Sequence, residues 1–397
     1  MRLVFFEMRK NFFKKSILIV LIIFTALNIF KIFSSYEMYG KFRNDKIGKA
    51  QSAYAEIYSD VSGKMTDSKI QLIVGEYKRL LNEISEFTYS KDYDENTYTG
   101  YIMGDFNLFK FDFFEPMNYA FNYSSYSKEI ANKAILNAEF FKSQNNTYEV
   151  QKNEMIADLY QNRKIESFYD YNGFEALFKY NFSSILIFLL CVFALTPVFV
   201  TEKETGMNLI LQVSQSGGVK TALAKYFAAI IFVLSICMWF FLCDIATFGL
   251  RYGFDGVLSP LYGIKEFKNT PLNISILGYC FVFFGIKALS ILSVSSLILL
   301  ISQFPKKIIF PFIINISIIF LLIFLSDLSG RHFYEMLNLF NPASLLTPTE
   351  IFKVFSVVRI FDIPISTYSI KAFFSAFVCC GTLLAICVSS KKRGWYI

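Results

Sequence analysis

Residues 180–200 have the sequence YNFSSILIFLLCVFALTPVFV and are followed directly by TEKETGMNLIL at 201–211. The first stretch is long and apolar enough to cross a bilayer as a helix, which takes about 20 largely apolar residues. The second stretch changes at once to charged and polar residues. The junction therefore predicts a membrane-spanning helix that leads into a short polar loop.

Five more apolar segments of this kind lie at 17–33, 222–250, 274–302, 308–325 and 370–388. The 397-residue chain is 54% hydrophobic and 18% charged, whereas soluble chains are about 45–50% apolar and about 25% charged. This composition excludes an ordinary secreted or cytosolic enzyme and a disordered chain. We expect an all-α polytopic membrane protein with six transmembrane helices.

The distribution of positive charge predicts how the helices are oriented. One set of flanks (1–16, 201–221, 303–307 and 391–397) carries 12 Lys/Arg against three acidic residues, while the opposite short loops (251–273 and 326–370) carry six of each. Positively charged loops stay in the cytoplasm, so both termini are expected there. The net charge of +7 then reflects topology, and no nucleic-acid partner is expected.

The N-terminal segment MRLVFFEMRKNFFKK mixes Phe with basic residues, which is typical of an amphipathic helix on the inner leaflet. The span that follows lacks a convincing cleavage site and is read as an uncleaved anchor rather than a signal peptide. Richness in Lys, Asn, Ile, Phe and Tyr suggests an AT-rich bacterial genome. The expected location is therefore the bacterial cytoplasmic membrane.

We divide the chain into 1–35 (amphipathic helix and first span), an extracellular domain at 36–179, and 180–397 with the remaining spans. The extracellular domain has no Cys and must fold without disulfides. Apolar spacing after Asp67, and at 128–143 and 149–165, predicts mainly helices. The stretch 89–126 has no clear period. Its aromatic residues form either a surface for amphipathic molecules or simply core: Tyr89, Tyr93, Tyr98, Tyr101, Phe106, Phe109, Phe111, Phe113 and Phe114.

No catalytic, cofactor or metal motif is present in the sequence. The nearest match to a phosphate-binding loop, SGGVKT at 216–221, has the wrong spacing. The chain has a single His, His332, which excludes a centre with several His ligands. With Arg331 and Glu335 it forms either a pH-sensitive cluster or a solvated helix start. Energy for any transport must come from a partner or an ion gradient.

The loop at 201–221 is the most informative segment for function. Glu202 and Glu204 would favour the start of a short helix. That helix would have an apolar side: Met207, Leu209, Ile210, Leu211 and Val213. Such a helix can insert into a groove of a cytoplasmic protein, or it can be a connector that rests on lipid.

The pattern E-x-E-x-G-M-x-x-x-L at 202–211, followed by G-x-x-K-x-x-x-A-K at 217–225, resembles the ABC type-2 permease family. The large domain after the first span is similar to members with an enlarged outer loop. NPASLL at 341–346 resembles the re-entrant segment of that family, here placed within 326–370. The resemblance implies a second permease subunit, identical or paralogous, and two ATPase subunits that bind ATP and Mg²⁺. The loop would couple them to the spans through Glu202, Lys203, Glu204, Thr205, Gly206 and Met207.

Lys287 lies near the middle of the fourth span, where a Lys costs about 2.5–3.5 kcal/mol on insertion scales. It either lines the transport pathway and holds an anionic group, or pairs with a carbonyl or hydroxyl, such as those of Ser290 or Ser293, and fixes helix packing. Lys31 and Asp244 are expected near the outer interface, where hydration lowers the cost of their charges.

These observations favour the transmembrane subunit of an ATP-driven ABC exporter that moves, or gives resistance to, an amphipathic compound such as an antimicrobial peptide, a lipid or a drug. The alternative is a non-transporting membrane sensor or scaffold whose extracellular domain detects a ligand. A secondary carrier should show inverted repeats and several mid-membrane charges, and neither is clear in this sequence.

Overall fold

The computed structural model describes residues 2–44, 57–88, 103–207, 210, 218–328 and 332–392. Within them, six helical segments are long and apolar enough to cross a membrane, which confirms the six predicted spans and indicates a multi-pass membrane protein. Their bounds are Lys15–Ser34, Asn172–Glu204, Val219–Tyr252, Ile276–Ser302, Ile309–Ser326 and Thr367–Lys391. The helices α2 (Lys15–Asn44), α13 (Val219–Tyr252), α14 (Ile276–Ser302), α15 (Ile309–Asp327) and α18 (Thr367–Lys392) contain five of these spans.

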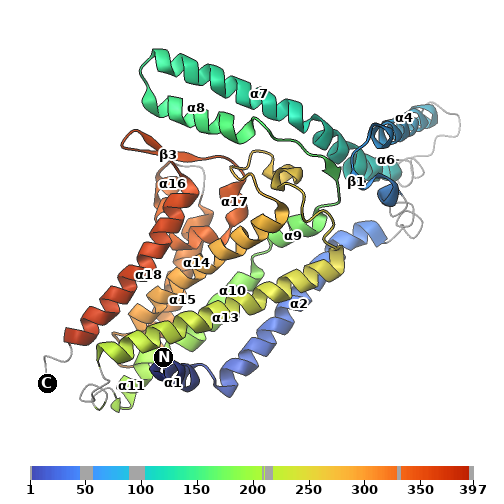
Figure 1. The fold of residues 1–397 in the computed structure, drawn as a ribbon. Helices are drawn as coiled ribbons and strands as arrows, with labels where there is room; N and C mark the ends of the chain where they lie inside the picture. Colours follow the sequence, from blue (N-terminus) through green and yellow to red (C-terminus); the bar gives the residue numbers. More distant parts are fainter. Residues whose placement is uncertain are drawn as a thin grey trace.

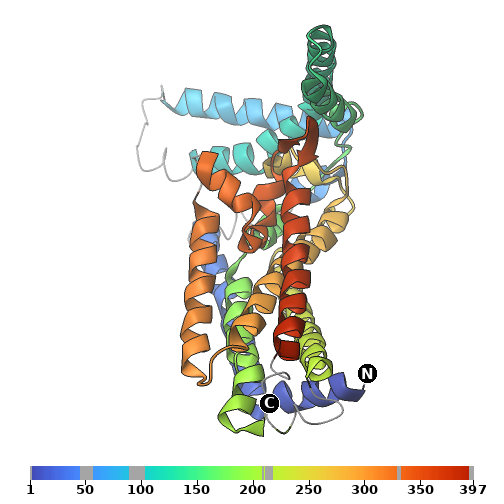
Figure 2. The same ribbon diagram turned by 90° about the vertical axis from the view of Figure 1, so that its left-hand side faces the viewer.

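The spans form a bundle with two different ends (Figures 1 and 2). Helix α1 (Arg2–Asn11) and the end of α18 lie at one end, which we call the N-terminal end. The segment between the first two spans, which we call the inserted domain, lies at the other end.

The second span is the central one. In its most apolar window 72% of residues are buried, against 17% for the first, fifth and sixth spans. It consists of three helices in series: α9 (Asn172–Lys179), α10 (Phe182–Leu195) and α11 (Pro197–Glu204). The first break leaves Tyr180 extended, with φ −79° and ψ 119°. The second falls at Pro197, the first residue of α11, a position that suits proline because an N–H there would lack a helical partner.

Helix α1 packs with a mixed side inward: Val4 and Met8 contact the apolar core of the bundle beside buried polar residues. Glu7 and Asn11 are buried, whereas Phe5 and Phe6 are 65% and 60% exposed. The predicted amphipathic helix is therefore present, but it ends at Asn11. Phe12 belongs to the segment expected to lie on the inner leaflet, but it is buried and stacks on Phe232 with ring centroids 4.3 Å apart.

The inserted domain is mainly helical, as predicted. It contains α4 (Asp67–Thr88), α6 (Met103–Phe109), the π-helix η2 (Lys110–Phe114), α7 (Glu115–Ser143) and α8 (Thr147–Tyr160). The strands β1 (Gly63–Lys64) and β2 (Ser167–Phe168) pair antiparallel, with Gly63 opposite Phe168. The predicted segment 128–143 is only the second half of α7, and α8 ends earlier than residue 165.

The stretch without a clear period is helical from residue 103 onward. Its period is obscured because its aromatic residues have different partners. Phe106, Phe109 and Phe113 are buried in the core with α4. The hydroxyls of Tyr119 and Tyr123 instead donate to backbone carbonyls of the loop between the third and fourth spans. These three Phe residues are therefore core, while Phe111 is 55% exposed and Phe114 stacks on Tyr77. Tyr89, Tyr93, Tyr98 and Tyr101 lie outside the described residues.

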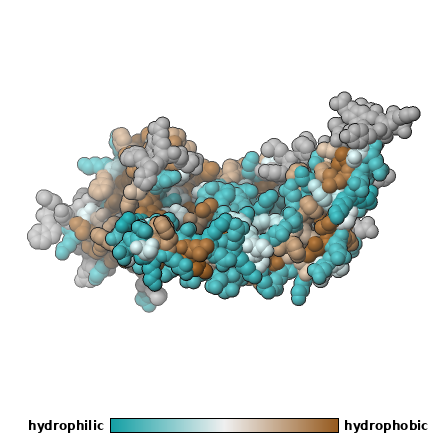
Figure 3. All heavy atoms as spheres, turned by 90° about the horizontal axis from the view of Figure 1, so that it is seen from above, coloured by the Kyte–Doolittle hydropathy of each residue, from teal (hydrophilic) through white to brown (hydrophobic). Residues whose placement is uncertain are grey.

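Seen from the inserted-domain end (Figure 3), hydrophilic residues cover much of the surface, with apolar residues between them. The long helix α7 contributes exposed Phe121, Leu136 and Phe140. Helices α7 and α8 form an antiparallel hairpin across this end (Figure 1).

The predicted re-entrant segment forms short elements: α16 (His332–Leu339), the 3₁₀ turn η5 (Pro342–Leu346), α17 (Pro348–Phe352), and the strands β3 (Val357–Ile360) and β4 (Ile363–Ser366). All five residues of η5 are buried, and η5 contacts α14, α15 and α18. Asn341 supports it by accepting from the Ala343 amide and donating to the Leu322 carbonyl. Irregular backbone inside a span bundle is tolerated where protein buries it.

Candidate functional site

A buried group of charged residues joins three elements at the N-terminal end. We call it the Glu202 cluster: Glu7, Lys10 and Asn11 of α1, Glu202 of α11 and Lys225 of α13. The Glu202 carboxylate is 2.5 Å from the Lys10 ammonium and 2.6 Å from the Lys225 ammonium. The Glu7 carboxylate lies 3.9 Å from the Lys225 ammonium and accepts from the Asn11 amide at 2.8 Å. Each buried carboxylate therefore has a cation or a hydrogen-bond donor.

Lys225 is the centre of this cluster. Its side chain is 1% exposed, and its ammonium also donates to the Val198 carbonyl at 2.8 Å and lies over the Phe199 ring. Burying an isolated charge costs several kcal/mol. The cluster thus fixes the end of the second span to α1 and α13, because separating them would leave charges without partners.

Lys203 and Glu204 fix the same segment to the connection between the fourth and fifth spans. The Lys203 ammonium donates to the carbonyls of Gln303 and Pro305. The Glu204 carboxylate accepts from the Ile308 amide at 2.7 Å. Both contacts lie in the connection between α14 and α15, so one short segment holds the ends of several spans together.

The predicted coupling residues therefore divide into two groups. Glu202 is buried and Lys203 is half-buried, and their charged groups bond other parts of this chain. Glu204, Thr205, Gly206 and Met207 are exposed. Gly206 has φ +70°, the left-handed region that glycine adopts without strain. Met207 is 47% exposed, and Ile210 is 69% exposed. Leu209, Leu211 and Val213 lie outside the described residues.

A second buried polar group lies inside the bundle, and we call it the Asp244 cluster: Asn28, Tyr180, Asp244 and Lys287. Asn28 donates to the Asp244 carboxylate at 2.6 Å and accepts from the Tyr180 hydroxyl at 2.8 Å. The Lys287 ammonium donates to the Tyr180 carbonyl at 2.8 Å. That carbonyl is freed by the break between α9 and α10, so Lys287 satisfies a backbone group that the helix cannot.

The Asp244 cluster corrects two expectations about single charges. Asp244 is 4% exposed, and its charge is stabilised by Asn28 rather than by hydration. Lys31 is exposed, and its expected place near the outer interface stays a prediction. Lys287 does bond a carbonyl, but the Ser290 hydroxyl donates to the Pro342 carbonyl and the Ser293 hydroxyl to the Ser290 carbonyl.

An arginine and several tyrosines join the inserted domain to the loop between the third and fourth spans. Arg163, 1% exposed, lies between the rings of Tyr160 and Tyr262 and donates to the Thr270 carbonyl at 2.8 Å. The Tyr123 hydroxyl donates to the Lys268 carbonyl at 2.8 Å. Burial raises the pKa of Tyr123 to about 12, although the nearby Arg163 charge opposes the shift. The hydroxyl therefore stays protonated and acts as a donor.

Glu266 anchors the same loop to the bundle. The loop contains the 3₁₀ turns η3 (Leu261–Gly263) and η4 (Lys265–Phe267). The Glu266 carboxylate is 2.9 Å from the ammonium of Lys179 and 2.9 Å from that of Lys353. Burial raises the pKa of Glu266, but hydrogen bonds from the two lysines outweigh it, so its pKa lies below the usual range.

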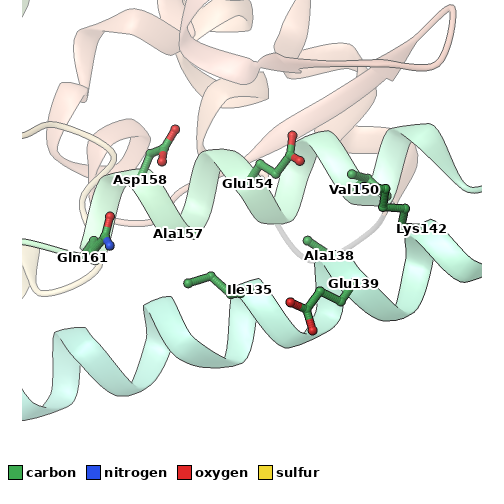
Figure 4. A pocket seen from close by; sticks show the side chains of 9 residues that line it. All are labelled: Ile135, Ala138, Glu139, Lys142, Val150, Glu154, Ala157, Asp158 and Gln161. Carbon is green, nitrogen blue, oxygen red and sulfur yellow. The ribbon is translucent and has the colours of Figure 1, made fainter.

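The hairpin α7–α8 encloses a pocket of about 280 Å³ (Figure 4). Ile135 and Ala138 of α7 and Ala157 of α8 line its apolar part. The carboxylates of Glu154 and Asp158 point in the same direction, away from α7 (Figure 4). Both acids are exposed and hydrated, so they do not define a binding site. In the described residues no group of three His, Cys, Asp or Glu side chains could hold a metal ion.

Sequence reasoning missed the partners that make the two clusters. Glu7 is the one acid in a basic N-terminal segment, and Lys225 lies a few residues inside an apolar run; both were visible signals of an internal ion pair. Of the predicted group Arg331, His332 and Glu335, Arg331 and the side chain of His332 lie outside the described residues. Glu335 is exposed.

Comparison of the chain with models of protein families, with curated proteins and with solved structures gives no match.

Proposed function

We propose that this chain is the transmembrane subunit of an ATP-driven exporter of the ABC type-2 kind, acting with a second permease subunit and separate ATPase subunits. One observation carries the proposal: the exposed residues Thr205, Gly206 and Met207 directly follow the most buried span. A force applied to these residues would pass along α11 into α10, the buried part of the same span.

The Glu202 cluster supports the same proposal. The residues just before the exposed turn are fixed to α1 and α13 by Lys10 and Lys225, and to the connection between α14 and α15 by Lys203. Because these contacts join several spans, a movement of the turn would move their ends together. Such a rigid, multiply anchored segment suits the transmission of a partner's ATP-driven closure.

The exposed surface of the turn fits a protein partner. Met207 and Ile210 are apolar and exposed at the end of the bundle that the charge distribution predicts to be cytoplasmic. An apolar helix end that inserts into a groove is a common mode of protein recognition. The cargo in this proposal remains an amphipathic compound, and the inserted domain would lie outside the cell.

The test is co-purification of the chain with its ATPase subunits from the native membrane, followed by an ATPase assay in lipid. Met207→Asp should abolish co-purification because it places a charge in an apolar contact, while the folded chain remains. Phe361→Asp is the matched control, because Phe361 is 95% exposed at the opposite end, in the turn between β3 and β4. A chain that binds no ATPase, or that binds it equally well with Met207→Asp, contradicts the proposal.

A further inference from the structure

A cavity of about 270 Å³ lies between α10, α13 and α14. Its mouth is at the bundle surface, where Leu234, Met238 and Phe281 are 43%, 56% and 71% exposed. Its inner wall includes the buried side chains of Phe240 and Ile291. Because the mouth lies between spans, an apolar chain can enter it sideways from the hydrocarbon core of the bilayer.

Charged side chains line the inner part of this otherwise apolar cavity. Lys287 and Asp244 both contribute to its wall. Asp244 is engaged by the Asn28 amide. An ammonium has three N–H donors, and among the described residues the Lys287 ammonium has one hydrogen-bond acceptor, the Tyr180 carbonyl. It therefore retains donors for a ligand that brings acceptor oxygens.

We propose that this cavity binds a single-chain amphiphile with an anionic headgroup, a carboxylate or a phosphate, whose oxygens accept from Lys287 and whose chain leaves through the mouth into the bilayer. The proposal names the substrate class of the exporter proposed above and rests on that function for its role in transport. The binding itself requires only this chain.

The size and chemistry of the cavity favour this class over others. Pockets that enclose a drug-sized ligand measure about 300–1,000 Å³, so a space of about 270 Å³ holds a headgroup and part of one chain, not a folded peptide. A cationic amphiphile would meet the Lys287 ammonium. The Asp244 carboxylate also lines the cavity, but it already accepts from the Asn28 amide, whereas the Lys287 ammonium still has donors to offer an anionic headgroup. A neutral alcohol would gain the apolar contacts but not the charge-assisted hydrogen bond, which is worth about twice a neutral one.

The structure offers a variant that blocks the cavity without disturbing its walls. Gly285 of α14 lines the cavity, and a Cβ added there meets nothing within 4 Å. Gly285→Leu would therefore fill the space at the mouth. Gly381 of α18 is the matched control, because a Cβ there also meets nothing within 4 Å and Gly381 is not among the lining residues.

The experiment measures equilibrium binding of radiolabelled palmitate, lysophosphatidate and hexadecanol to the full chain in phosphatidylcholine nanodiscs, without any ATPase. We expect saturable binding of palmitate, lysophosphatidate or both. Hexadecanol should bind about 10-fold or more weakly, because a hydrogen bond to a charged group contributes about 1.5–3 kcal/mol. Gly285→Leu and Lys287→Met should each weaken binding of the anionic amphiphile by at least that factor, and Gly381→Leu should not.

Equal affinity for hexadecanol, or unchanged binding in Gly285→Leu, would overturn the proposal and assign the cavity to bulk lipid chains. Gly285→Leu keeps the test decisive if Lys287→Met fails to fold, since loss of Lys287 leaves the Tyr180 carbonyl without its donor. Failure here leaves the co-purification test at Met207 untouched, and failure of that test leaves this binding result standing.

Discussion

Replacing Lys225 with Met tests whether the Glu202 cluster holds the end of the second span. The substitution removes the ammonium 2.6 Å from the Glu202 carboxylate and the donor to the Val198 carbonyl. Breaking a buried ion pair by removing one partner costs about 3–5 kcal/mol. We expect the lower end, about 3 kcal/mol, because Lys10 remains 2.5 Å from Glu202.

The assay is thermal unfolding of the purified chain in detergent. With about 2 °C of Tm per kcal/mol, Lys225→Met should lower Tm by about 6 °C. Lys10→Met removes the same charge from a side chain that is 33% exposed, where an ion pair is worth about 0–1 kcal/mol, so Tm should fall by less than about 2 °C. Adding Glu202→Gln to Lys225→Met should restore about half of the loss, because the carboxylate left with fewer partners is gone. Equal losses for Lys225→Met and Lys10→Met would refute this account of the cluster.

Three further predictions concern other parts of the chain. Asn28→Leu removes the donor to Asp244. Because a hydrogen bond to a charged group is worth about 1.5–3 kcal/mol, Tm should fall by about 3–6 °C. An unchanged Tm would contradict the role given to Asn28. Gly206→Ala places a residue with a side chain at a backbone φ of +70°, at a cost of about 1–2 kcal/mol. Coupled ATPase activity should fall, while Tm changes by less than about 4 °C. Full coupling in this variant would argue against a defined turn. The lowered pKa of Glu266 stabilises the folded chain at pH values above the usual pKa of Glu, and this stabilisation is lost as the pH falls through the lowered value. Glu266→Gln should therefore flatten the decline of Tm below about pH 4.5. An unchanged decline would exclude this contribution.

The spans could be predicted from sequence because each is a continuous apolar run, and the cost of exposing such a run in water depends on its composition alone. The division of the loop after the second span into a buried part and an exposed part could not be predicted from the sequence. Glu202 is buried and Thr205 is exposed because Lys10 and Lys225, at distant sequence positions, meet Glu202 in space.

Lys287 shows the same limit of local reasoning. The partners expected from the sequence were hydroxyls or carbonyls of the same span: those of Ser290, one helical turn away, and of Ser293, nearly two turns away. The acceptor is instead the Tyr180 carbonyl, 107 positions away, which is free only because the helix breaks between α9 and α10. Helix breaks of this kind follow from packing of the whole bundle, and no single apolar run encodes them.

Site-specific cross-linking from residue 207 tests the central claim most directly. A photoreactive amino acid in place of Met207, in native membranes, should cross-link a protein that carries a phosphate-binding loop of the form G-x-x-x-x-G-K-[ST]. The same amino acid in place of Phe361 should not. No such product from position 207, or equal yields from both positions, would contradict the account of this chain as an exporter subunit coupled through the turn at Thr205, Gly206 and Met207.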